Sequence, residues 1–94
     1  MPSAPVITAP ACILCANAPA VLQQLSAALG GRGGCVDLAE CEVFDSSLIA
    51  VLLELRRRFS SNAGAQLHVQ NPPSNLRKLA ALYGVDGILF DERN

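Results

Sequence analysis

The clearest pattern in the chain is a helical one that runs from Ser46 to about Ser60. Apolar residues recur there every three or four positions, while Ala50, Glu54 and two arginines fall on the opposite side. The apolar stripe consists of Leu48, Val51, Leu52, Leu55 and Phe59. We expect this stripe to face a sheet.

Ile49 and Leu53 widen the apolar face of this helix beyond the stripe, because they lie beside it by roughly 100° of helical rotation. Two interpretations are open. The pair faces a partner protein, or it packs against another helix of the same chain.

Two further helices are predicted, one before this helix in the sequence and one after it. The first begins near Pro19, which suits the first turn of a helix, and ends before a glycine-rich loop at residues 30–34. Its inward positions are Val21, Leu22, Leu25 and Leu29. The other begins at Ser74 or Asn75 and stops at Gly84. Its inward positions are Leu76, Leu79 and Leu82.

Residues 66–70 alternate between polar and apolar side chains and predict a strand with Leu67 and Val69 inward and His68 outward. The sequence offers His68 no Cys or second His placed as an obvious partner. A lone histidine does not make a catalytic site, so we expect no catalytic residues and no enzyme.

Further strands are predicted at residues 5–9, 11–16 and 35–39, and a short apolar run at residues 88–90 closes the chain. Strands alternate with helices along the sequence. This order predicts an α/β fold with a small, mostly parallel sheet of four to five strands and about three helices packed on one face.

The composition indicates a folded chain and excludes some function classes. Of 94 residues, 51% are hydrophobic and 16% are charged, so we expect a single domain over residues 1–94, with residues 1–10 weakly ordered or forming an edge strand. A net charge of −1, with Arg56 to Arg58 as the basic cluster, argues against nucleic-acid binding. No apolar run reaches the ~20 residues that span a bilayer, and the start lacks the basic segment of a secretory signal, so we expect a cytoplasmic protein.

The four cysteines suggest a zinc site or a redox pair, because Cys12 and Cys15 form a CxxC and Cys35 and Cys41 follow. We interpret residues 12–15 as part of a buried strand, on which positions three apart point to opposite faces and cannot converge on one metal. All four cysteines are then reduced and mostly buried, and we expect no metal. The alternative is a zinc protein or a small thiol oxidoreductase.

The segment Phe44-Asp45-Ser46-Ser47 opens directly into the strongest helix and is the candidate site. Asp45 is the expected N-cap, with the two serines in the first turn. A phosphate on either serine would be favoured by the helix start and repelled by the neighbouring carboxylate, so such a site can switch. The alternative is that Asp45 and Ser46 only cap a helix.

Two segments resemble the STAS domain family, which has the fold of anti-sigma factor antagonists. In the first, a strand that carries Asp37-Leu38 leads to Asp45-Ser46-Ser47 at a helix start. In the second, a leucine-rich helix ends in Leu82-Tyr83-Gly84-Val85, which is similar to the tail of the small STAS subunit of Mla phospholipid-transport ABC complexes. The resemblance covers roughly residues 11–89 and implies a STAS-like fold.

The family resemblance implies a protein-interaction module that has no cofactor and is not an enzyme. It implies docking on the ATPase subunit of an ABC transporter, and contact with the inner membrane only through that complex. The candidate contact residues are Asp45, Ser46, Ser47, Leu48 and Ile49, with Leu53 and Tyr83 as supporting contacts. Leu48 and Ile49 stand where the family usually has a glycine, which would hinder close approach of a partner. The alternative partner is an anti-sigma factor serine kinase, which phosphorylation of Ser46 or Ser47 would release.

Overall fold

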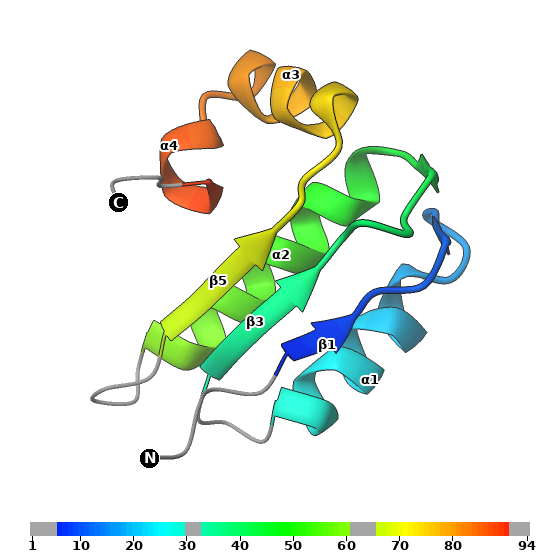
Figure 1. Cartoon of the computed structure of the whole chain (residues 1–94), viewed down its shortest axis with the longest axis vertical. Helices are drawn as coiled ribbons and strands as arrows, with labels where there is room; N and C mark the ends of the chain where they lie inside the picture. Colours follow the sequence, from blue (N-terminus) through cyan, green and yellow to red (C-terminus); the bar gives the residue numbers. More distant parts are fainter. Residues whose placement is uncertain (1–5, 30–32, 61–65, 91–94) are drawn as a thin grey trace.

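The computed structural model describes residues 6–29, 33–60 and 66–90, which form alternating strands and helices (Figure 1). The elements are β1 Val6–Thr8, β2 Cys12–Ile13, α1 Ala18–Leu29, β3 Gly33–Asp37, β4 Val43–Phe44, α2 Ser46–Ser60, β5 Gln66–Gln70, α3 Ser74–Leu82 and α4 Asp86–Leu89.

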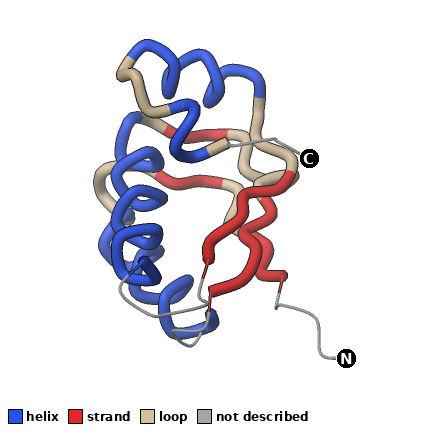
Figure 2. Tube along the Cα trace, turned by 90° about the vertical axis from the view of Figure 1, so that its left-hand side faces the viewer, coloured by secondary structure: helices blue, strands red, loops and turns tan. Residues whose placement is uncertain are grey.

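The described strands form two parallel sheets. In the larger sheet β3 lies between β1 and β5, and in the smaller one β2 pairs with β4. Helices α1 and α2 cover one face of the larger sheet, as the side view in Figure 2 shows, while α3 and α4 lie beyond the end of β5 (Figure 1). The predicted α/β fold with parallel strands is confirmed, although its strands are divided between two sheets.

The predicted stripe of α2 packs into the core. All five of its members are buried, at 3% exposure or less: Leu48, Val51, Leu52, Leu55 and Phe59. They meet buried residues of α1, including Leu25, and of β3, including Val36. Because α2 packs against α1, β5 and α3, its position depends on most of the chain.

Ile49 lies inside the molecule, and Leu53 lies partly inside it. Ile49 is 4% exposed and belongs to the core, and Leu53 is partly buried and packs against the core. Since α2 lies beside α1, the wide apolar face serves packing between helices of the same chain. The interpretation that Ile49 faces a partner is wrong.

The inward face of α3 differs from the predicted one. Leu76 and Ala80 are fully buried and Leu79 is partly buried, but Leu82 is 79% exposed. Residues four apart lie on one helical face, whereas Leu82 is rotated by roughly 120° from Leu76. The helix then ends as predicted: Gly84 has a φ of 76°, and the N–H groups of Gly84 and Val85 donate to carbonyls of the last turn.

The least accurate prediction concerns residues 11–16. Only Cys12 and Ile13 form a strand, because residues 15–17 form a turn that leads into α1. The central strand β3 begins at Gly33 and ends at Asp37, earlier than predicted. The short strand β4 lies in a segment for which no strand is predicted, and the terminal apolar run belongs partly to α4.

Among the described residues, none of the helices is both long enough and apolar enough to cross a bilayer.

Candidate functional site

The candidate site is the junction at which β4 ends and α2 begins. Asp45 lies between the two elements, and its Oδ1 accepts the backbone N–H of Ser47 at 2.8 Å. Its carbonyl oxygen accepts the N–H of Leu48 at 3.0 Å. Asp45 is therefore the N-cap of α2, because it satisfies an N–H group that has no partner within the helix.

The second carboxylate oxygen of Asp45 reaches another part of the chain. Its Oδ2 accepts the backbone N–H of Cys15 at 3.1 Å, from the turn between β2 and α1. The backbone N–H of Asp45 donates to the carbonyl of Ile13 at 3.3 Å. The N–H of Ser47 first, and that of Cys15 second, hold the pKa of the Asp45 carboxyl below its ordinary value. The carboxylate is thus ionised near neutral pH and is bonded on both oxygens within the chain.

Asn17 holds the turn that supplies this Cys15 N–H group. Its Oδ1 accepts the N–H of Leu14 at 2.6 Å, and its Nδ2 donates to the carbonyl of Cys12 at 2.9 Å. The carbonyl of Leu14 in turn accepts the N–H groups of Asn17 and Ala18. These bonds bend the chain immediately after β2, which is why residues 12–15 do not continue as a strand.

The structure distinguishes the two serines, which the sequence does not. Ser46 is exposed, whereas Ser47 is partly buried and its hydroxyl also hydrogen-bonds the Asp45 carboxylate. Ser46 therefore carries the more accessible of the two hydroxyls.

Leu48 and Ile49 do not reach the surface of the junction. Their exposed fractions are 0% and 4%, so the expectation that these side chains contact a partner is not supported by their placement. They also do not crowd the helix start, because the position one turn beyond Ser46 on the exposed side is Ala50. The exposed side of the first turn therefore carries the small, uncharged side chains of Ser46 and Ala50.

The two supporting residues lie outside the junction. Leu53 is partly buried against the core, and Tyr83 is the C-cap of α3, 56% exposed. Tyr83 adjoins the exposed Leu82, on a helix that starts beyond the end of β5 (Figure 1).

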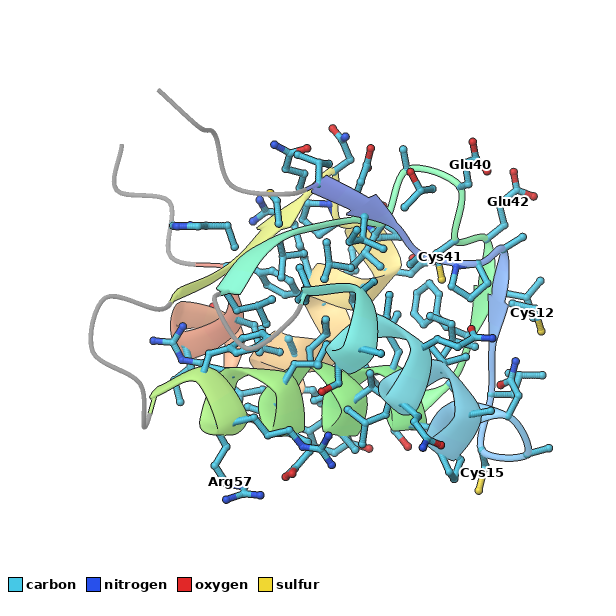
Figure 3. All side chains as sticks on the ribbon, turned by 90° about the horizontal axis from the view of Figure 1, so that it is seen from below. Cys12, Cys15, Glu40, Cys41, Glu42 and Arg57 are labelled. Carbon is cyan, nitrogen blue, oxygen red and sulfur yellow. The ribbon has the colours of Figure 1, made fainter. Side chains whose placement is uncertain are left out.

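The cysteines are free, but only two of them are buried. Cys35 and Cys41 are buried, whereas Cys12 and Cys15 are exposed, with their sulfur atoms directed away from the ribbon at one end of the molecule (Figure 3). The prediction of a buried Cys12–Cys15 strand is therefore wrong, since Cys12 is exposed on β2 and Cys15 is exposed in the turn that follows. Burial raises the pKa of the Cys35 and Cys41 thiols. Among the described residues, no group of three or more His, Cys, Asp or Glu could hold a metal ion.

His68 has a cysteine neighbour that the sequence did not reveal. The parallel register of β3 and β5 sets His68 opposite Cys35, and His68 is exposed as predicted. Burial, and then the charge of Asp37, raise the pKa of the Cys35 thiol, which favours its protonated, unreactive form. Predicting this proximity would have required the register of β3 and β5, which local sequence does not reveal.

Glu40 and Glu42 extend from the end that carries Cys12, whereas Arg57 extends from α2 well away from them (Figure 3). Arg57 and Arg58 both pair with Glu54, with N–O distances of 2.6 and 2.9 Å. Hydrogen bonds from Arg57 first, and then from Arg58, lower the pKa of Glu54 to about 2.

A parallel sheet covered by helices on one face, with an Asp-Ser-Ser segment at the start of α2, is the arrangement expected of a STAS-type interaction domain. The chain belongs to the STAS family, since a family model matches residues 2–90. That model is described as "Mlab, STAS domain", so the resemblance is to the MlaB type of STAS protein. STAS domains typically mediate protein–protein interactions and are generally non-enzymatic. Searches of curated proteins and of solved structures found no match.

Proposed function

We propose that the chain is a cytoplasmic accessory subunit that binds and stabilises the ATPase of an Mla-type phospholipid-transport ABC complex, which maintains outer-membrane lipid asymmetry. The match to the MlaB STAS family over residues 2–90 carries this proposal. The exposed Ser46 at the start of α2 provides the contact point, and the protein reaches the membrane only through the complex.

The geometry of the junction supports a docking role for Ser46. Asp45 uses both carboxylate oxygens within the chain, so it braces the helix start and leaves Ser46 as the exposed polar group. The buried Leu48 and Ile49 anchor the first turn of α2 in the core. A rigid surface loses little conformational entropy on binding, which favours a stable complex.

The proposed stabilisation of the ATPase follows from mass action. A protein that binds the folded ATPase and not its unfolded chain shifts the folding equilibrium toward the folded form. This role requires neither ATP nor lipid to touch the STAS chain.

The test compares two serines that each occupy the first position of a helix, Ser46 of α2 and Ser74 of α3. Ser46→Asp places a second carboxylate beside Asp45 on the proposed contact and should weaken binding to the purified ATPase subunit by roughly tenfold or more. Ser74→Asp adds the same charge at the control position and should leave the affinity unchanged. Calorimetric titration measures both, with circular dichroism to confirm the fold. Equal affinity of Ser46→Asp and the wild type would contradict docking at this helix start.

Identifying the partner requires a separate experiment. The tagged chain is used to capture proteins from its native membrane-containing lysate, and the bound proteins are identified by mass spectrometry. Recovery of an ABC ATPase together with its permease supports the transporter role, whereas recovery of a small soluble kinase without membrane proteins contradicts it.

A second candidate function, an anti-sigma factor antagonist, is favoured by the exposed Ser46 hydroxyl beside an ionised Asp45. In this role a serine kinase binds the same surface, and a phosphate on Ser46 introduces negative charge next to the carboxylate and releases the partner. Phosphate found on Ser46 in the protein isolated from its cells, together with capture of the kinase, would favour this function over the transporter role.

A further inference from the structure

We infer that Asn17 is a positioning residue of the docking surface, although it lies on a different segment from Ser46. This inference rests on the proposed function, because it concerns how the proposed contact is held in place. It begins from the two hydrogen bonds of the Asn17 side chain, to Leu14 and to Cys12.

Asn17 occupies the position just before α1, where an asparagine side chain usually accepts an N–H group from the first turn of its own helix. Its backbone carbonyl follows that pattern and accepts the N–H of Val21 at 3.0 Å. Its side-chain bonds instead reach backward, to the N–H of Leu14 and the carbonyl of Cys12. The side chain therefore braces the turn that precedes α1.

This turn orients the N–H of Cys15 toward the Asp45 carboxylate, which is thirty residues further along the chain. If Asp45 bonded only to Ser47, it would be an ordinary N-cap, and its carboxylate could rotate about the side-chain bonds. With Cys15 bonded to Oδ2 and Ser47 bonded to Oδ1, the carboxylate is held at both oxygens. Charge-assisted bonds of this kind are the stronger ones in proteins, so the pair fixes the start of α2.

The consequence is that Asn17 acts on Ser46 indirectly: it bonds Leu14 and Cys12 in the turn, the turn supplies the Cys15 N–H group to Asp45, and Asp45 precedes Ser46. Without the Asn17 side chain, the turn keeps only its backbone bonds, so the Cys15 N–H group is held less firmly. Asp45 then keeps only its bonds to Ser47, and Ser46 is presented from a looser helix start. Asn17 does not itself touch the partner in this arrangement.

The test uses Asn17→Ala, which removes both side-chain bonds, and Asn75→Ala, which replaces an exposed asparagine of α3 as the control. Amide NMR shifts of Cys15 and Ser47 report the two bonds to Asp45, and titration against the purified ATPase subunit reports docking. We expect Asn17→Ala to move both amide shifts and to lower the affinity of the folded protein by roughly tenfold. Asn75→Ala should change neither, and Asn17→Asp, which keeps an acceptor for Leu14, should recover part of the affinity.

Unchanged Cys15 and Ser47 shifts in Asn17→Ala, or an affinity equal to that of the wild type, would overturn the positioning role. A failure of the proposed function looks different, because the wild-type chain would then not bind the ATPase at all. The amide shifts would still decide whether Asn17 holds Asp45, since they are measured without the partner.

Discussion

Two of the helices that the structure describes, α2 and α3, begin with a serine, and their starts are built differently. The start of α2 follows Asp45, whose carboxylate accepts N–H groups from its own helix and from a remote turn. The start of α3 follows Pro73, which makes no side-chain hydrogen bond at the cap. A serine at a helix start is therefore not a distinguishing feature by itself. The α2 start is distinguished by the carboxylate that ties it to a segment far away in the sequence.

The largest expected effect is a difference in the stability lost when a leucine is removed from each helix, because the two helices differ in burial. Leu52 of α2 is fully buried, so Leu52→Ala should lower the free energy of unfolding by about 2–5 kcal/mol through lost contacts and a cavity. Leu82 of α3 is 79% exposed, and Leu82→Ala should change stability by no more than about 0.5 kcal/mol. Urea unfolding followed by circular dichroism measures both variants. Similar losses in the two would show that α2 is not the more deeply packed helix.

A smaller effect is expected at the caps. Asp45→Ala removes the acceptor of two N–H groups and should lower the melting temperature, with faster hydrogen exchange of the Cys15 and Ser47 amides. Ser74→Ala removes no bond that holds α3 at its cap and should leave the melting temperature nearly unchanged. If Asp45→Ala melts at the wild-type temperature and its Cys15 and Ser47 amides stay protected from exchange, the bonds to Asp45 do not stabilise the start of α2.

The smallest expected effect is a pH dependence from Glu54, whose pKa is lowered from 4.5 to about 2 by Arg57 and Arg58. A carboxyl with a lowered pKa in the folded state contributes stability above its unfolded pKa and loses it as the pH falls through the folded pKa. The wild type should therefore be slightly more stable than Glu54→Gln near neutral pH, and this advantage should disappear between pH 4.5 and about 2. The bonds of Glu54 to Arg57 and Arg58 are exposed to solvent, so the stability advantage is small. Melting curves of both proteins over this range would reveal a constant difference if Glu54 were not responsible.

Much of the fold could be predicted where local sequence and tertiary packing agree. The bounds of α2 were predicted to within a residue, because a capping aspartate and a long apolar stripe mark the same helix. The strand β5 followed from strict alternation, and the end of α3 followed from Gly84, whose positive φ suits glycine.

The errors arose where remote contacts decide the local structure. Residues 11–16 look like a strand, but the side chain of Asn17 turns the chain after Ile13. The pairing of His68 with Cys35 depends on strand register, which no local pattern encodes. At the candidate site the cap could be predicted from the sequence, whereas the bond from Cys15 and the difference in exposure between the two serines could not.

The bond between Cys15 and Asp45 also has a consequence for the order of folding. Its two residues are thirty positions apart, and they follow β2 and β4, which pair with each other in the smaller sheet. Closing so long a loop costs entropy that only the formed sheet and core can offset. A nascent or partly unfolded chain therefore lacks the braced helix start, even where α2 has already formed as a helix. A partner that recognises this start would discriminate finished molecules from unfinished ones, and assembly would itself act as a check on folding.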